Sequence, residues 1–255
     1  MSELLQVQGL NKWFGGLHAV KDVSFALQPG SITGVLGPNG AGKTTMFNLL
    51  TGFIAVDSGS VLFDGHSLTG LVPHRIVNCG LARTFQLARP FAGMSVVENV
   101  EVACLAPRVR KAGKPRERAR ALLDQVGLGR QAELDADVLP YGDLRRLEIA
   151  RALATNPKLL LLDEPFAGLG GSEIGPLAEL IRTLHESEGL SILIIEHKLR
   201  EFMQLVHHVI AMDFGEVVAV GTPSEIVRHP RVIEAYLGTA QIDLELARHE
   251  GAGRA

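Results

Sequence analysis

The feature that most constrains the fold of this chain is a glycine-rich segment that follows a short apolar run. The segment fits the pattern G-x-x-x-x-G-K-[ST] and consists of Gly37, Pro38, Asn39, Gly40, Ala41, Gly42, Lys43 and Thr44. Residues 31–36 before it predict a buried strand, and residues 44–51 after it predict a helix with apolar residues at helical spacing. The pattern requires this order of strand, loop and helix, because a helix N-terminus adds partial positive charge.

The residue types in this segment suit the binding of phosphate groups. Glycines let the backbone approach an anion without an intervening side chain, and successive N–H groups then point into one cavity. Lys43 adds a positive charge within reach of the outer phosphates, and the Thr44 hydroxyl stands where a magnesium ion binds in such loops. We therefore expect a phosphate-binding loop, and the alternative is a glycine-rich turn that binds nothing.

Length, charge and cysteine content narrow the class of protein. A chain of 255 residues with 46% hydrophobic residues is long enough for one large α/β domain, or for one core plus a smaller lobe. The formal net charge of −3 argues against a nucleic-acid binder, which is usually basic. Cys79 and Cys104 lack metal-binding spacing and are too few for a disulfide scaffold, so we expect a reducing, cytosolic compartment.

No segment of the sequence is predicted to enter a membrane. The first residues show neither the basic part nor the long apolar part of a signal peptide, so we expect none. No run approaches the roughly 18 consecutive apolar residues of a transmembrane helix. If the protein works at a membrane, we expect it to dock onto another protein there.

Short apolar runs alternate with amphipathic segments through the second half of the chain. We expect strands at residues 159–162, 191–195 and 209–212, and helices at residues 144–155, 174–188 and 199–207. Such alternation predicts a parallel sheet covered by helices, and hence the α/β fold class. Residues 2–28 are expected to be rich in β-structure, with further strands at 60–63 and 81–86.

The composition changes between residues 87 and 140, where we expect a mainly helical lobe inserted into the α/β core. A helix is predicted over residues 116–126, with apolar residues on one face. The region also holds a basic run, opposed within it only by Glu117, of Arg108, Arg110, Lys111, Lys114, Arg116, Arg118 and Arg120. We interpret this run as a solvated face, and the alternative is a contact with anionic lipid headgroups or an acidic partner surface. The polar tail at 241–255 is expected to dock or to fray.

Two apolar strands end in polar residues that suit phosphate chemistry. Asp163 and Glu164 follow the strand at 159–162, and His197 follows the strand at 191–195. The carboxyl ends of parallel strands meet in the crevice where α/β proteins place ligands. Beside a phosphate loop, Asp163 is the expected magnesium-side residue, and Glu164 is placed to deprotonate a water that attacks a γ-phosphate. We expect His197 to contact phosphate as well, and the alternatives are a solvated acidic turn and a structural histidine.

Gln86 and a glycine-containing helix start at 139–146 complete this series of motifs. Their order resembles that of the nucleotide-binding subunits of ATP-binding cassette (ABC) transporters, over nearly the whole chain. Three stretches look more narrowly like the ATP-binding subunits of branched-chain amino acid importers, namely FGGLHAV at 14–20, ARTFQ at 82–86, and LPYGD at 139–143 with RRLEIARA at 145–152. Residues 221–226 and 235–238 also match the narrower group.

The resemblance implies a fold in more detail. The fold would be that of a P-loop NTPase of the ABC ATPase type, with a RecA-like core sheet and an N-terminal antiparallel β subdomain. A helical subdomain would be inserted at about residues 87–155 of a single nucleotide-binding domain that spans residues 1–240. The tail at 241–255 would follow this domain.

The resemblance also assigns roles to the candidate site residues. Phe14 would stack on adenine, and Gln86 would approach the magnesium ion and the attacking water. Glu164 would be the general base, and His197 the switch histidine at the γ-phosphate. The other implied ATP-binding positions are the phosphate loop through Lys43, Thr44 and Thr45, and the residues Leu139, Tyr141, Gly142 and Asp143 of the signature segment at 139–143. The implied cofactors are ATP and Mg²⁺, with Thr44, Gln86 and Asp163 on the metal side.

The implied assembly is peripheral to the cytoplasmic face of the inner membrane. Two cassettes, identical or homologous, would sandwich two ATP molecules, so that the signature segment of each chain serves the other chain's site. Closure on ATP and reopening after hydrolysis would move two transmembrane permease subunits. An extracytoplasmic solute-binding protein is an indirect partner, and no nucleic acid is expected. The alternatives are a soluble ABC ATPase without a transport role and a cassette that serves another solute, such as lipid or urea.

The chain departs from the commonest signature of that family, Leu-Ser-Gly-Gly-Gln. Pro140 stands in place of the serine and has neither an N–H nor a hydroxyl to offer a phosphate. Gly170 stands where many relatives have Asn or Asp, whose side chain aligns the opposite site. We hypothesise that the half-site this chain gives to its partner is weaker than the half-site it keeps.

Overall fold

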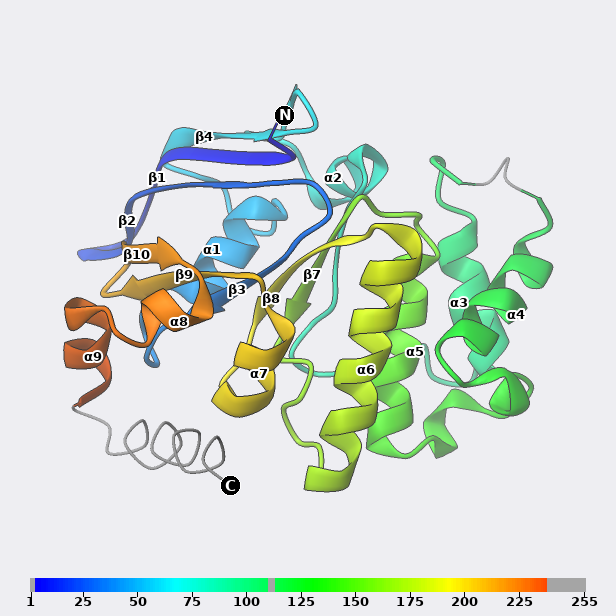
Figure 1. Ribbon diagram of the computed structural model, residues 1–255. Helices are drawn as coiled ribbons and strands as arrows, with labels where there is room; N and C mark the ends of the chain where they lie inside the picture. Colours follow the sequence, from blue (N-terminus) through cyan, green and yellow to red (C-terminus); the bar gives the residue numbers. More distant parts are fainter. Residues whose placement is uncertain (1–2, 110–112, 238–255) are drawn as a thin grey trace, which may run out of the picture.

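The computed structural model describes residues 3–109 and 113–237, and its centre is a six-stranded sheet (Figure 1). The strand order is β10-β9-β3-β8-β7-β6. The bounds of these strands are β3 Ile32–Leu36, β6 Leu81–Arg83, β7 Leu159–Asp163, β8 Ser191–Ile195, β9 His208–Asp213 and β10 Glu216–Gly221. Neighbouring strands are parallel, except that β10 runs antiparallel to β9. The expected α/β fold class is confirmed.

The parallel register brings three strand ends to one level. Val35 of β3 pairs with Ile195 of β8, and Ile195 pairs in turn with Asp163 of β7. The chain segments that follow these strands therefore leave the sheet at the same edge. They carry the glycine-rich loop, Glu164 and His197, which lie far apart in the sequence.

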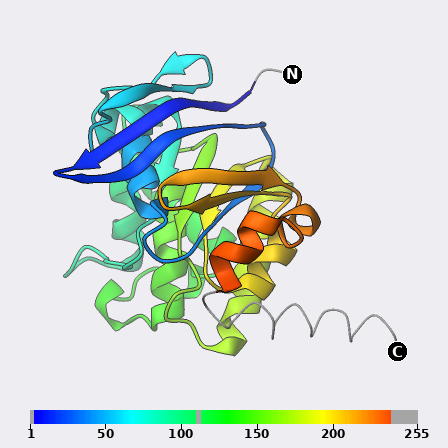
Figure 2. The same cartoon turned by 90° about the vertical axis from the view of Figure 1, so that its left-hand side faces the viewer.

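A second, antiparallel sheet is stacked over the first, as the two views in Figures 1 and 2 show. Its strand order is β2-β1-β4-β5. The strands are β1 Leu5–Phe14, β2 Leu17–Leu27, β4 Ser58–Phe63 and β5 His66–Ser67. Apolar residues of both sheets and of helix α1 (Lys43–Leu50) form one continuous core cluster. The expected N-terminal β-rich region is therefore a layer that encloses α1 against the central sheet.

Helices cover the other face of the central sheet, and a second core cluster lies beneath them. These helices are α5 Tyr141–Leu153, α6 Gly171–Glu188 and α7 Leu199–Leu205. Three shorter helices lie elsewhere around the sheets, namely α2 Pro73–Cys79, α8 Pro223–Ile226 and α9 Pro230–Leu237. In β7, Leu160 and Leu162 belong to the helix-side cluster, whereas Leu159 and Leu161 belong to the cluster between the sheets. Successive strand residues point to opposite faces, so a strand covered on both faces needs the continuous apolar run seen in the sequence.

A helical lobe packs against α5. It consists of α3 Val96–Cys104, α4 Pro115–Gln125 and the 3-10 turns Gly129–Gln131 and Ala136–Val138. Ser95 caps α3 in a capping box with Glu98, which fixes where that helix begins. The helix expected at 116–126 is α4, while the proposed subdomain limits near residues 87 and 155 stay a prediction.

The described part of the basic run lies on or beside this lobe, and two of its arginines in α4 meet acidic groups from other elements. Arg116 pairs with Glu101 at 3.6 Å and with Glu133 at 3.0 Å, and Arg120 also pairs with Glu133. Arg108 instead donates to backbone carbonyls near the start of β7 and the end of α2. Such exposed pairs contribute little to stability and agree with a solvated face. Residues 110–112 of the run, residues 238–240 and the tail at 241–255 lie outside the described residues.

The strand expected over residues 81–86 is shorter than predicted and ends at Arg83. Thr84 still donates its N–H to the Leu161 carbonyl of β7 at 2.9 Å, but Phe85 leaves the sheet because its backbone groups find partners on α5. The Phe85 N–H donates to the Glu148 carboxylate at 2.6 Å, and the Phe85 carbonyl accepts from Arg145 at 2.9 Å. Local sequence pattern cannot reveal this competition, because the two helix residues lie about sixty positions away in the chain.

Two helices begin earlier than predicted. The helix expected from residue 144 begins at Tyr141, directly after Pro140 at its N-cap. The helix expected from residue 174 begins at Gly171, because the Glu173 carboxylate accepts the Gly170 N–H and completes the first turn. The helix expected over residues 199–207 ends at Leu205. Besides the two 3-10 turns, the described elements that the sequence analysis did not predict individually are α2, α3, β5, β10, α8 and α9.

Within residues 3–109 and 113–237, the structure contains no helix whose length and apolar character would let it cross a membrane. The longest helix, α6, has 18 residues but carries glutamates along it.

The packing of α7 against β3 generates a test of the fold. An added Cβ at Gly34 would lie 2.1 Å from Cζ of the fully buried Phe202. We expect Gly34→Ala to lower the free energy of unfolding by about 1–3 kcal/mol, since overpacking a dense core forces rearrangement. Gly171→Ala is the matched control, because an added Cβ there meets no atom within 4 Å, and it should stabilise by up to about 1 kcal/mol. Urea unfolding measures both, and an undiminished stability of Gly34→Ala would contradict this packing.

Candidate active site

The glycine-rich loop closes on itself between β3 and α1. Gly40 and Gly42 both have positive φ, of 82° and 97°, and the Ala41 N–H donates to the Pro38 carbonyl at 3.2 Å. A Cβ at Gly37 would lie 2.3 Å from the Met212 carbonyl oxygen, so the loop also needs glycine for its close approach to β9. The result is a compact backbone ring at the N-terminus of α1, where N–H groups and partial positive charge collect.

Lys43 fills this ring with its own side chain. Its Nζ donates to the carbonyl oxygen of Gly37 at 2.6 Å and to that of Pro38 at 3.0 Å. Burial lowers the pKa of Lys43, while the carboxylates of Glu164 and Asp163 act in the opposite direction. An anion that entered the loop would stabilise the charged ammonium directly, because a close opposite charge offsets the cost of burial.

A cavity of about 570 Å³ opens beside the loop. The turn between β1 and β2 forms one wall, with Phe14, Leu17 and His18, and Glu164 and His197 lie at its border. Phe14 is 45% exposed, and its ring faces the cavity that the loop also lines. The structure thus brings Phe14 and the loop residues Asn39 to Thr45 to one cavity, as the sequence analysis expected. A flat aromatic side chain on such a wall suits contact with a ring of a bound ligand.

Glu164 is held between two of the other predicted residues. Its Oε2 accepts a hydrogen bond from Nε2 of Gln86 at 2.9 Å, and its Oε1 lies 2.9 Å from Nε2 of His197. The Glu164 backbone has a positive φ of 49°, and its N–H donates to the Ile195 carbonyl at 2.9 Å. A non-glycine residue in this region of φ marks a site whose surroundings impose the conformation. The three residues therefore meet although they come from three separate segments.

Asp163 has a partner that the sequence analysis missed. Arg83 donates to Oδ2 of Asp163 at 2.6 Å, and both side chains are nearly buried, with 5% and 3% exposure. Arg83 also donates to Oδ1 of Asn48 at 2.7 Å. The pair lies 80 positions apart in the sequence, so neither residue's neighbours indicate it.

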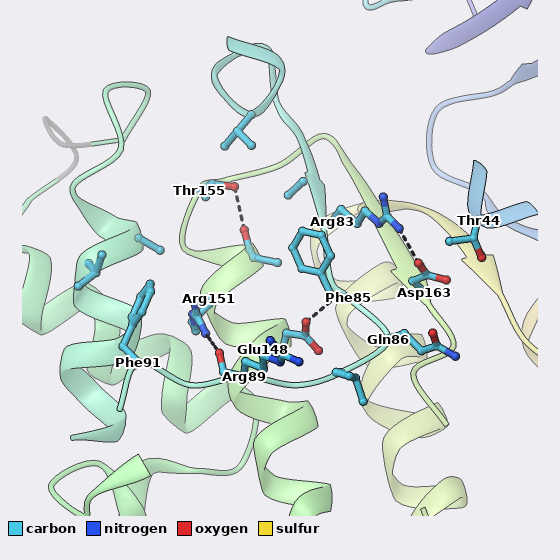
Figure 3. Close-up of a pocket in the computed structure, with 16 residues that line it drawn as sticks. Thr44, Arg83, Phe85, Gln86, Arg89, Phe91, Glu148, Arg151, Thr155 and Asp163 are labelled. Carbon is cyan, nitrogen blue, oxygen red and sulfur yellow. Dashed lines mark hydrogen bonds and ion pairs between the residues drawn. The ribbon is translucent and has the colours of Figure 1, made fainter. Parts of the chain in front are cut away.

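The residues predicted for the metal side share one cavity. Thr44, Gln86 and Asp163 all line a space of about 650 Å³, and Figure 3 draws Asp163 between Arg83 and Thr44. These groups supply oxygen donors, which suit Mg²⁺, and one carboxylate is typical of sites where substrate phosphates complete the coordination. No group of three or more His, Cys, Asp or Glu side chains within the described ranges can hold a metal ion. The oxygen donors of Thr44, Gln86 and Asp163 fit Mg²⁺.

Glu196 is a further residue whose importance the sequence did not reveal. Its buried carboxylate accepts N–H groups of Phe166 at 2.6 Å, His197 at 2.8 Å and Lys198 at 3.1 Å. Burial raises the pKa of Glu196, and the three backbone donors oppose that shift. The carboxylate ties the segment that carries His197 to the loop after β7. Its position directly after an apolar strand is the signal that could have found it.

The signature segment lies apart from the phosphate loop in this chain. Gly142 and Asp143 line a separate small cavity of about 200 Å³ together with residues of α6. An added Cβ at Gly142 would meet the Glu173 carboxylate at 2.6 Å, so the helix start packs closely there. Leu139 is buried, whereas Tyr141 is 36% exposed. The structure does not bring this segment to the cavity of Lys43 and Glu164.

The last described helix reaches the phosphate loop. Burial raises the pKa of Tyr236 in α9, and a hydrogen bond with the backbone of Gly37 opposes that shift. Val232 of the same helix is buried in the helix-side core. Helix α9 is thus packed against the loop that precedes α1.

Comparison with known proteins identifies the family. The family model described as "ABC transporter" matches residues 20–167, and the model described as "Branched-chain amino acid ATP-binding cassette transporter" matches residues 216–241. The chain is 42% identical over 251 residues to the high-affinity branched-chain amino acid transport ATP-binding protein LivG of Escherichia coli, covering 93% of this chain and 98% of that protein. It is 40% identical, with the same coverage, to the corresponding protein BraF of Pseudomonas aeruginosa.

Solved structures give the same result. The crystal structure of the ADP conformation of MJ1267, an ATP-binding cassette of an ABC transporter, superposes with a TM-score of 0.84 at 31% sequence identity. That match covers 93% of this chain and 100% of the other. A nucleotide-free cassette from an ABC transporter superposes with a TM-score of 0.82 at 30% identity, covering 92% and 99% of the two chains. The chain therefore belongs to the ABC transporter family of nucleotide-binding cassettes, in the group of branched-chain amino acid ATP-binding proteins.

Proposed function

We propose that this chain hydrolyses ATP as the energy-coupling subunit of an importer for branched-chain or related hydrophobic amino acids or amides. The observation that carries the proposal is the Glu164 carboxylate, held 2.9 Å from both Gln86 and His197 at the border of the phosphate-loop cavity. The names of the similar proteins LivG and BraF support the choice of solute.

In the proposed hydrolysis of ATP, different site residues bind the phosphates, accept the proton and orient the attacking water. The loop N–H groups and Lys43 hold the β- and γ-phosphates, and Thr44 and Asp163 would hold Mg²⁺, which would supply positive charge beside the phosphate oxygens. Glu164 takes a proton from the attacking water as the water oxygen bonds to the γ-phosphorus. The bond from that phosphorus to the β–γ bridging oxygen breaks, which releases ADP and inorganic phosphate. Gln86 and His197 orient Glu164 and the water.

A second cassette completes each site in this proposal. The separation of Gly142 and Asp143 from the cavity of Lys43 supports a role for the signature segment at the γ-phosphate of the partner's ATP. The partial positive charge at the start of α5 would face that phosphate. Phe14 would stack on adenine at the far end of the chain's own site.

Two permease subunits are the proposed membrane partners, and they place the chain at the cytoplasmic face. Several large apolar side chains around the cavity in Figure 3 are 41–59% exposed, namely Phe85, Leu87, Phe91 and Val102. A group of exposed apolar residues of this kind marks a protein interaction site. Because Gln86 lies between Phe85 and Leu87, a partner bound here is adjacent to the residue that contacts Glu164.

The roles of Lys43 and Glu164 are separable by substitution. Lys43→Ala should weaken ATP binding by about tenfold or more, because it removes a buried charge from the phosphate loop. Glu164→Gln should retain ATP binding and slow hydrolysis by about 10²- to 10⁴-fold, because it removes the base and keeps the loop. Nucleotide affinity and single-turnover hydrolysis measure the two effects, with the exposed Glu186→Gln as control. Hydrolysis by Glu164→Gln at the wild-type rate would refute this role for Glu164.

The weak half-site hypothesis is tested at the starts of α5 and α6. Pro140 provides no side-chain cap to α5, and an added Cβ at Gly170 would lie 3.3 Å from the Glu173 carboxylate. Pro140→Ser together with Gly170→Asn adds a hydroxyl and a neutral amide without new charge beside Glu173. We expect higher ATPase turnover of the assembled complex, measured by phosphate release. Unchanged turnover by a folded double variant would rule out the hypothesis.

Capture from membranes of the native cell tests the transport role. Tagged Glu164→Gln with ATP should retain two multi-span permease subunits and a second cassette, identified by mass spectrometry. Adding Leu87→Glu should release the permeases while ATP binding persists, because it places a charge in the exposed apolar group. Val220→Glu is the control, since Val220 is 58% exposed on the edge strand β10. Recovery of soluble partners alone, from protein that binds ATP, would favour an ABC ATPase without a transport role.

A further inference from the structure

We infer that Arg145 is a positioning residue that holds Gln86 against Glu164 and ties both to α5, the helix that begins in the signature segment. This inference rests on the proposed function and deepens it. Arg145 lies in the second turn of α5, and its side chain is only 2% exposed. Most hydrogen bonds of its guanidinium go to backbone carbonyls of two loops, and one goes to an acidic side chain.

The first loop carries Gln86. Arg145 donates from Nη1 to the Phe85 carbonyl at 2.9 Å and from Nη2 to the Gln86 carbonyl at 2.5 Å. One turn further along α5, the Glu148 carboxylate accepts the Phe85 N–H at 2.6 Å. The backbone of this segment is therefore held by an acceptor and a donor from the same helix face. Gln86 cannot shift along α5 without breaking several of these bonds.

The second loop follows Glu164. Nη2 of Arg145 also lies 3.4 Å from the Ala167 carbonyl oxygen. The same guanidinium nitrogen thus joins the backbone of Gln86 to the segment that carries Glu164, while the Gln86 side chain donates to Glu164 directly. The two loops are thus connected twice, once through the guanidinium of Arg145 and once through the hydrogen bond from Gln86 to Glu164. The distance from the amide to the carboxylate depends on both.

The partners of Arg145 show that it is not simply an ion pair within the core. Its contact with Glu148 is 3.4 Å long, and Nε of Arg145 is buried without a hydrogen-bond partner in the described part of the chain. The guanidinium carbon also lies 5.1 Å from the centre of the Tyr141 ring. Burying a guanidinium in this way is costly, and an apolar side chain would fill the space at lower cost. What the arginine supplies instead is a fixed fork of donors that matches the two loops.

The position of Arg145 on α5 has a mechanical consequence. The helix begins at Tyr141 and Gly142, in the segment proposed to contact the γ-phosphate of the partner's ATP. A movement of the helix start on engagement of that phosphate is therefore passed to the Phe85–Gln86 backbone within one to two helical turns. Arg145 accordingly lets the occupied state of one site adjust the Gln86–Glu164 contact in the other.

The test compares Arg145→Met with Arg108→Met in the assembled complex. Arg108 is the matched control because it also donates to three backbone carbonyls, those of Asn78, Cys79 and Asn156. Arg145→Met should lower kcat about tenfold or more, with the affinity for ATP changed less than about threefold. Arg108→Met should leave kcat unchanged. Arg145→Lys should recover part of the activity, because its ammonium group can donate hydrogen bonds but lacks the fixed, planar arrangement of the guanidinium N–H groups.

A double-mutant cycle with Gln86→Ala separates positioning from general damage. If Arg145 acts through Gln86, Arg145→Met should cost little further kcat once Gln86 is alanine. Additive losses, or a folded Arg145→Met with wild-type kcat, would overturn the inference. If Arg145→Met does not fold, Arg145→Lys and Glu148→Gln replace it in the same cycle.

Hydrogen exchange gives a measurement that does not depend on activity. The Phe85 N–H should exchange faster in Arg145→Met and at the wild-type rate in Arg108→Met, and equal rates in all three proteins would overturn the inference. Failure of the proposed function has a different signature, namely wild-type ATPase that is absent or insensitive to Glu164→Gln. The two failures are therefore distinguishable in one set of variants.

Discussion

The active site depends on the level at which three parallel strands end. The pairing of Val35 with Ile195, and of Ile195 with Asp163, fixes the relative heights of β3, β8 and β7. A shift of one residue along β7 would exchange the side chains that fill the helix-side cluster with those that fill the cluster between the sheets, and dense packing on both faces opposes such a shift. Hydrophobic burial on both faces of the sheet therefore sets the geometry of polar chemistry at its edge.

Each charged group at that edge already has a partner supplied by the protein. Lys43 bonds two loop carbonyls, Asp163 bonds Arg83, and Glu164 lies between Gln86 and His197. Buried charges without partners are strongly destabilising, so these contacts let the site exist before nucleotide binds. In the proposed mechanism, they would also keep the reactive groups close to their working positions, which reduces the reorganisation needed for catalysis.

The sequence predicts the parts of the site that local pattern encodes. The phosphate loop is a contiguous motif, and Glu164 and His197 directly follow apolar strands, so their meeting follows from a parallel sheet. Arg83, Arg145 and Glu196 were not predicted, because their roles arise from contacts with segments distant in the chain. The same cause shortened the strand expected at 81–86, where α5 outcompetes the sheet for the backbone of Phe85. Tertiary contacts of this kind leave no periodic signal in the sequence.

The contact of Tyr236 with the first glycine of the phosphate loop bears on how such cassettes diversify. The helix that carries Tyr236 also buries Val232 in the core, so residues 230–237 form an integral layer of the nucleotide site. Exchanging this region between two related cassettes would therefore transplant a wall of the phosphate loop together with the tail. Chimaeras joined near residue 216 would inherit nucleotide-binding properties from both parents, even though every catalytic side chain came from one.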